Sequence, residues 1–146
     1  MPPQEVSKSS QPQGGVLQDR DIIRHRLSYL HPDDRRKRFK WYPQEWKTSG
    51  SEILLAGSSQ KFNTFKGLDH PTKYAKKIVS KIRKFTDRNI IYRPKPSWRD
   101  ATPIDGTYFS REKGIYEVLD RASVMVTYGS NSCFEALLYG IPAIVL

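Results

Sequence analysis

The stretch that predicts the fold class most clearly lies at the carboxyl end of the chain: Ala122-Ser-Val-Met-Val-Thr-Tyr-Gly-Ser-Asn-Ser-Cys-Phe-Glu-Ala-Leu-Leu-Tyr-Gly-Ile-Pro-Ala-Ile-Val-Leu146. Its first part, Ser123 to Thr127, is an apolar and β-branched run without a charge, which predicts a strand buried on both faces. The polar segment from Tyr128 to Ser132 cannot continue that strand and is rich in residues that start helices. A short helix is expected next and ends at Gly140. Residues 141–146 then predict a second buried strand.

The expected helix has two notable features. Ser132 followed three residues later by Glu135 has the spacing of a capping box, and Phe134, Leu137 and Leu138 are expected to form the apolar face. The whole unit is a βαβ crossover, whose turn lies where open parallel sheets bind ligands. Backbone N–H groups at the helix start would favour an anion such as a phosphate. The alternative is that Ser132 and Glu135 only cap a helix.

Strands and helices alternate through the preceding residues as well. Strands are expected at Glu52–Ala56 and Asn89–Arg93. A helix from His70-Pro71 to about Phe85 has Asp69 as its expected N-cap. A second helix at residues 114–121 directs Ile115, Val118 and Leu119 inward. Loops are expected from Gly57 through Asn63, Gly67 and Asp69, and at residues 101–110. The alternation predicts an α/β fold, an open Rossmann-like parallel sheet flanked by helices.

Composition divides the chain into three parts. Residues 1–16 are rich in Pro, Gln, Ser and Gly and predict a disordered tail. Residues 17–50 predict a helical, basic connector, with an amphipathic helix near residues 18–30 and a solvated charge run at residues 33–40. Residues 51–146 predict the folded domain. A hydrophobic fraction of 37% fits a folded portion joined to a polar segment.

Charge and cysteine content narrow the function classes. The formal net charge of +10 permits binding to nucleic acid, an anionic surface or a phosphorylated small molecule. One cysteine, Cys133, excludes an intramolecular disulfide framework and a Cys-based metal site. No apolar run is long enough for a membrane span, and the first residues do not form a signal peptide. We therefore expect a cytoplasmic protein.

Polar turns follow three of the expected strands and would lie along one edge of the sheet. Fixed positive charge beside hydroxyls and backbone donors suits a diphosphate. The candidate ligand-binding residues are Arg93, Lys95, Ser97, Tyr128, Ser130, Asn131, Ser132 and Glu135, with Gly57, Ser58 and Ser59 as a secondary set.

Several of these segments resemble the donor-binding half of GT-B-fold glycosyltransferases. The resemblance is carried by Ile-Tyr-Arg-Pro-Lys-Pro-Ser97, by the turn that ends at Ser132, and by Glu135-Ala-Leu-Leu-Tyr-Gly-Ile-Pro142. It covers roughly residues 41–146 and is nearest to capsular-polysaccharide-type transferases and related phage glycosyltransferases. It implies polysaccharide biosynthesis with a nucleotide-sugar donor, a glycan or other hydroxyl acceptor, no bound cofactor and no metal.

The resemblance also implies roles for individual residues. Arg93 and Lys95, with Ser130, Asn131 and Ser132, would face the donor phosphates, and Glu135 would lie near the donor sugar or ribose. Related enzymes often have His where Lys95 stands. They also continue beyond the strand that ends this chain and carry an acceptor-binding domain, so the resemblance implies a partial donor domain. No catalytic base is identified, because Asp105 and His70 fit a turn and a helix start.

Two alternatives come from other classes. A basic nucleic-acid-binding module would be suited by the charge run from Arg35 to Lys40, the lysines of the helix at residues 72–85 and the three tryptophans. The strand edge after Ile144 would suit an inactive fragment that packs on a partner chain or forms a homo-oligomer.

Overall fold

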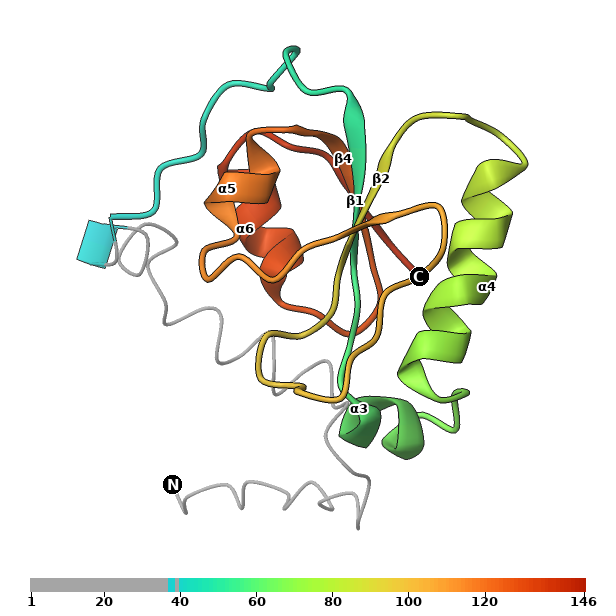
Figure 1. The fold of residues 1–146 in the computed structure, drawn as a ribbon. Helices are drawn as coiled ribbons and strands as arrows, with labels where there is room; N and C mark the ends of the chain where they lie inside the picture. Colours follow the sequence, from blue (N-terminus) through green and yellow to red (C-terminus); the bar gives the residue numbers. More distant parts are fainter. Residues whose placement is uncertain (1–36, 39) are drawn as a thin grey trace, which may run out of the picture. The chain divides into compact units, whose positions relative to one another are not determined.

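The computed structural model describes residues 37, 38 and 40–146. The chain divides into two compact units, Met1–Trp41 and Tyr42–Leu146, and the sheet with its labelled helices belongs to the second (Figure 1). The tail predicted for residues 1–16 and the helix predicted near residues 18–30 lie outside the described residues. So does most of the predicted charge run at residues 33–40.

The second unit is an open, Rossmann-like α/β fold, as predicted. Its five-stranded sheet is parallel throughout, in the order β3-β2-β1-β4-β5. The strands are β1 (Glu52–Ala56), β2 (Ile90–Arg93), β3 (Tyr108–Phe109), β4 (Ala122–Thr127) and β5 (Ala143–Val145).

Helices cover both faces of this sheet (Figure 1). They are α3 (Gln60–Phe65), α4 (Pro71–Arg83), α5 (Tyr116–Leu119) and α6 (Ser132–Leu138). One core lies under α4 and contains Ile78, Val79 and Tyr92. The other contains Leu54, Val118 and Met125 and lies on the side of α5 and α6. Burial on both faces explains why the central strands read as uninterrupted apolar runs.

The central elements lie close to their predicted bounds. β1 matches residue for residue, and its Leu54 and Leu55 are fully buried. Each such side chain contributes about 1.5–3 kcal/mol by leaving water. In α4, Ile78 and Val79 face the core as predicted, and Pro71 occupies the first turn. Asp69, however, is not the N-cap, which is His70 without a side-chain bond.

Two short elements occupy segments that the sequence predicts as loops. α3 forms because Ser59 caps it by accepting a hydrogen bond from the Phe62 backbone N–H, and because Asn63 is buried beneath it. β3 has only two residues, Tyr108 and Phe109, which pair with β2 inside the segment predicted to be irregular. Neither element has enough residues for a periodic pattern, so only the packing reveals them.

The prediction for β5 was wrong in its burial. β5 is the last strand of the sheet in the described residues, and its side chains are exposed: Ile144 by 52% and Val145 by 63%. An apolar composition alone does not distinguish an edge strand from a central one.

Both details predicted for α6 were also wrong. Ser132 is the first residue of the helix, Asn131 is the N-cap, and no side chain caps it. The capping box of Ser132 with Glu135 is therefore not formed. Of the predicted apolar face, Phe134 is 65% exposed. The buried residue is Ala136, since its small side chain lets the short helix lie close to the sheet.

The segment before β1 packs against the carboxyl end of α6. The backbone N–H of Gln44 donates to the Leu138 carbonyl, and that of Lys47 donates to the Gly140 carbonyl, both at 2.8 Å. Gly140 has a φ of +80°, and a Cβ added there would lie 2.1 Å from the Glu45 carbonyl oxygen. The compact unit thus begins at Tyr42, within the predicted connector.

Candidate functional site

The strand order defines the place at which a ligand would bind. The chain builds β1, β2 and β3 in one direction, then crosses to the other side of β1 to build β4 and β5. The connections on the two sides of β1 therefore diverge, and a crevice opens at the carboxyl ends of β1 and β4. In open α/β sheets this reversal of strand order is where ligands bind.

A cavity of about 260 Å³ lies at this edge. It brings together six of the predicted residues: Gly57, Arg93, Lys95, Ser130, Ser132 and Glu135. Three predicted turns contribute to it, those that follow β1, β2 and β4. The other lining residues are Ala56, Pro94, Pro96, Lys113 and Ile115. Of these, Lys113 and Ile115 belong to the loop before α5. The sequence analysis did not predict this part of the wall, because the loop follows β3, a strand too short to predict.

Arg93 is largely committed to the protein's own backbone. It is only 6% exposed, and its guanidinium donates to the Glu112 carbonyl at 2.6 Å and to the Lys113 carbonyl at 3.3 Å. A third bond reaches the Ser110 hydroxyl at 3.4 Å. Burial lowers the Arg93 pKa, and the negative charges of Glu112, Glu117 and Glu135 oppose that shift. Arg93 thus fixes the loop that forms one wall of the cavity.

Lys95 and Lys113 are the accessible cations of the cavity. Both side chains are exposed, and neither ammonium group is hydrogen-bonded or ion-paired within the part of the chain that the structure describes. They come from different loops, one after β2 and one before α5. Two unpaired ammonium groups at one cavity favour an anionic ligand.

The hydroxyls of Ser130 and Ser132 form the opposite side. Their Oγ atoms are 2.6 Å apart, and the Ser132 backbone N–H donates to the Ser130 Oγ at 3.3 Å. The turn that holds them depends on Gly129, whose φ is +66° and whose added Cβ would lie 2.1 Å from Cζ of Phe62. The close approach of α3 therefore sets the position of the two hydroxyls.

Glu135 supplies the one carboxylate among the residues that line this cavity. Its side chain is exposed on α6, and its charge acts on the buried Arg93. A carboxylate accepts hydrogen bonds from hydroxyl groups but repels a phosphate. The cavity therefore has a cationic part, at Lys95 and Lys113, and a part suited to a hydroxylated group.

The other predicted residues do not line this cavity. Ser58 is buried and donates to the Asn63 side chain, and Ser59 caps α3. Tyr128 is buried in the core on the α4 side, where desolvation raises its pKa. Ser97 and Asn131 are exposed without lining it.

A smaller cavity of about 180 Å³ continues the first one. The two share Arg93, Pro94, Pro96 and Lys113. Its further wall is Ser110, Arg111 and Glu112, and the hydroxyl of Ser110 donates to the Glu112 carboxylate. That hydrogen bond is the largest of the effects that lower the Glu112 pKa. The two cavities are therefore adjacent, and we call them together the groove.

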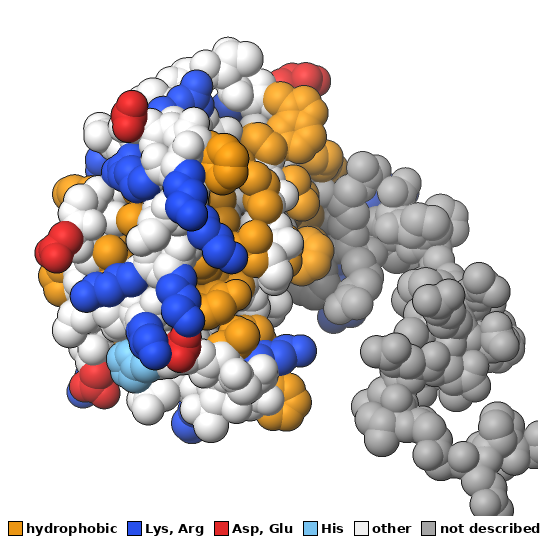
Figure 2. Space-filling model, turned by 90° about the vertical axis from the view of Figure 1, so that its right-hand side faces the viewer, with side chains coloured by type: hydrophobic (Ala, Val, Ile, Leu, Met, Phe, Trp, Pro, Cys, Tyr) orange, Lys and Arg blue, Asp and Glu red, His pale blue; other side chains and the backbone are white. Residues whose placement is uncertain are grey.

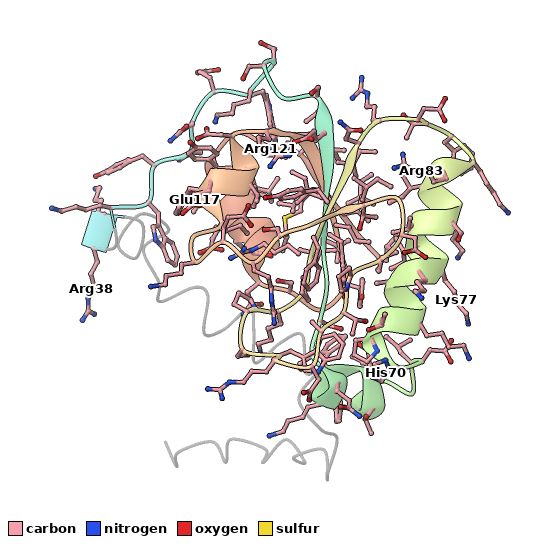
Figure 3. All side chains as sticks on the ribbon, viewed as in Figure 1. Arg38, His70, Lys77, Arg83, Glu117 and Arg121 are labelled. Carbon is pink, nitrogen blue, oxygen red and sulfur yellow. The ribbon has the colours of Figure 1, made fainter. Side chains whose placement is uncertain are left out.

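Neither residue considered as a base lines these cavities. His70 lies at the junction of α3 and α4, with its ring 5.6 Å from that of Trp98 (Figure 3). Asp105 is an exposed turn residue. Among residues 37, 38 and 40–146, no group of three or more His, Cys, Asp or Glu side chains could hold a metal ion. No helix in this part of the chain is long and apolar enough to cross a membrane.

In comparisons with known proteins, no family model and no curated protein sequence matches the chain.

Proposed function

We propose that this chain supplies the donor-binding part of a glycosyltransferase, which transfers a sugar from a nucleotide-sugar to a hydroxyl of a glycan or another acceptor. The observation that carries the proposal is the pair of unpaired ammonium groups, Lys95 and Lys113, at the reversal of strand order. The hydroxyls of Ser130 and Ser132 and the carboxylate of Glu135 support it from the other side of the cavity.

Each group of the cavity matches a part of such a donor. The diphosphate carries negative charge that Lys95 and Lys113 offset, and the two serine hydroxyls donate hydrogen bonds to its oxygens. Glu135 accepts from sugar or ribose hydroxyls. The smaller cavity beside Arg93 gives the ligand room to extend toward Arg111.

The proposed reaction is direct displacement. An acceptor hydroxyl oxygen bonds to the anomeric carbon and passes its proton to a base supplied by the acceptor-binding part of the enzyme, while the bond from that carbon to the diphosphate oxygen breaks. The nucleotide diphosphate leaves with both bonding electrons. Lys95 and Lys113 stabilise the negative charge that develops on this oxygen. In this way the chain lowers the activation barrier. The proposal includes a cytoplasmic location, with which the single Cys133 is compatible.

The test is a titration of nucleoside diphosphates and nucleotide-sugars by calorimetry. We expect binding that weakens about tenfold in Lys95→Ala and in Lys113→Ala, since each loses one charge-assisted contact. Lys76→Ala is the matched control, because Lys76 is an exposed lysine on α4 that does not line the cavity. Ser130→Ala should weaken binding less, as a neutral hydrogen bond is lost.

A different pattern would contradict the proposal. If no nucleotide binds and oligonucleotides do, with affinity that falls steeply as salt rises, the chain is a nucleic-acid-binding module. Equal losses in Lys95→Ala and Lys76→Ala would show that the cavity does not hold the ligand.

A further inference from the structure

The smaller cavity of the groove differs in chemistry from the first one. Its lining residues come from two loops, 93–96 and 110–113, and its volume is about 180 Å³. Pro94 and Pro96 supply apolar walls, and Glu112 supplies the one carboxylate among the residues that line it. A few polar groups set against apolar walls fix the orientation of a ligand. This cavity therefore suits a group that combines an apolar surface with hydrogen-bond donors.

Two arginines hold the two loops of this cavity together. Arg111 donates to the backbone carbonyls of Trp98 and Arg99, both at 3.3 Å. Arg93 donates to the backbone carbonyl of Glu112 at 2.6 Å. Both guanidinium groups are thus engaged by the backbone of the opposite loop. A cavity whose walls are fixed in this way binds a ligand without the cost of ordering them.

The Glu112 carboxylate is oriented by two hydroxyl groups. Tyr108 donates to its Oε1 at 3.1 Å, and Ser110, which is only 1% exposed, donates to its Oε2. Ser110 also accepts a hydrogen bond from Arg93 at 3.4 Å, which leaves its own hydrogen for Glu112. Within the described residues, no Lys or Arg forms an ion pair with this carboxylate. Its negative charge is therefore available to a ligand.

Each oxygen of Glu112 keeps a free acceptor position. A carboxylate has about four lone-pair positions, and the hydroxyls of Tyr108 and Ser110 use one on each oxygen. Two adjacent acceptors match two parallel N–H donors. Among the nucleobases, guanine has such a pair, its ring N1–H and its 2-amino group. Cytosine and adenine have one amino group beside a ring acceptor, and uracil has none.

Positive charge alone does not select a ligand on this molecule. Figure 2 shows Lys and Arg side chains in a row over the side of the molecule on which α4 lies. Exposed cations attract the phosphates of every nucleotide alike. Discrimination among nucleotides needs a group that meets the base, and Glu112 in the smaller cavity is such a group.

We propose that the smaller cavity binds guanine, so that the donor is a guanosine diphosphate sugar. The ribose and the diphosphate lie in the first cavity, beside Glu135, Lys95 and Lys113, and the base enters the smaller one. There guanine donates its N1–H and an amino hydrogen to the two oxygens of Glu112. Uracil has carbonyl oxygens on both sides of its N3–H, and the carboxylate repels them. This inference rests on the proposed glycosyltransferase function, because it names the donor of the same groove.

The experiment titrates the full chain by calorimetry with the diphosphates of guanosine, inosine, cytidine and uridine. Inosine has the base of guanosine without the 2-amino group. We expect guanosine diphosphate to bind about tenfold more tightly than uridine diphosphate and about fivefold more tightly than inosine diphosphate, with cytidine diphosphate in between. Lys95→Ala should weaken all four by the same factor, because they share the diphosphate.

Glu112→Gln tests the contact with the base. The variant replaces one acceptor oxygen by an amide group, so guanosine diphosphate should weaken about tenfold and lose its advantage over uridine diphosphate. Glu117→Gln is the matched control, since it removes the same charge near Arg93 but lines neither cavity. Urea unfolding of both variants checks that they are folded under the conditions of the titration.

The outcomes separate this inference from the function on which it rests. If none of the four nucleotides binds, the proposed function fails and the base assignment fails with it. If they bind through Lys95 but guanosine and uridine diphosphates bind equally, only the base assignment is overturned, and this comparison needs no variant at Glu112. A preference for guanosine over inosine diphosphate that survives in Glu112→Gln would also overturn it, because another group would then bind the amino group.

Discussion

The Arg93 side chain lines both cavities, but its three donor contacts are to the chain itself. A buried guanidinium without these partners would be costly, because its charge would lose water and gain nothing in return. Arg93 therefore lines the cavity, and its contact with donor phosphates stays a prediction. Arg93 holds the loop, and the exposed Lys95 and Lys113 are available to a ligand.

Gly129 should be the least replaceable residue of the turn after β4. Gly129→Ala would place a Cβ in a left-handed backbone conformation, which costs about 1–2 kcal/mol, and against the Phe62 ring, which costs about 1–3 kcal/mol. We expect a loss of about 2–5 kcal/mol in urea unfolding. Gly106→Ala is the control: its φ is +75°, but an added Cβ meets nothing within 4 Å. Equal losses in the two variants would show that Phe62 yields without cost.

The lowered pKa of Glu112 predicts that the free energy of unfolding depends on pH in the acid range. The Ser110 hydroxyl donates to its carboxylate and lowers its pKa in the folded state. A lowered folded pKa means that the contribution is present above the unfolded value, about 4.3, and is lost as pH falls below it. The free energy of unfolding should therefore fall less steeply with acid in Glu112→Gln than in the parent chain. Identical slopes in urea titrations from neutral to acid pH would refute this.

Among the secondary elements, α3 links the turn after β1 to the start of α4. Its Asn63 is 1% exposed, accepts from Ser58 and donates to the Asp69 carbonyl at 2.7 Å. Asn63→Ala would leave both groups without a partner, and we expect a loss of about 1–3 kcal/mol with faster hydrogen exchange at residues 57–59. Thr64→Ala, on the exposed side of α3, is the control. Similar exchange in the two variants would contradict this linking role.

For the molecule as a whole, a ligand at the groove should raise the melting temperature. A nucleoside diphosphate at 100 times its Kd would stabilise the fold by about 2.7 kcal/mol. For a unit of this size, in which 1 kcal/mol shifts the midpoint by roughly 4–8 °C, the midpoint should rise by roughly 10–20 °C. Inorganic phosphate at the same concentration is the control, since it lacks the ribose that Glu135 would bind. An equal shift with phosphate alone would show that the site recognises only charge.

The net charge of +10 is a property of the whole molecule, and the basic residues are spread over several surfaces. Exposed lysines lie both on α4 and around the groove. The groove combines its cations with hydroxyls and one carboxylate, which suits a ligand that carries both phosphate and hydroxyl groups.

The alternation of apolar strands with amphipathic helices is a local property, so the parallel sheet and the bounds of β1, α4 and β4 could be predicted from the residues alone. The same alternation predicted that the three polar turns after these strands lie along one edge of the sheet. Tertiary packing decided the rest. α3 and β3 are too short to show a period, and the strand order places β5 at an exposed edge. Arg93 turns inward because the loop carbonyls of Glu112 and Lys113, some 20 residues later in the chain, lie within its reach.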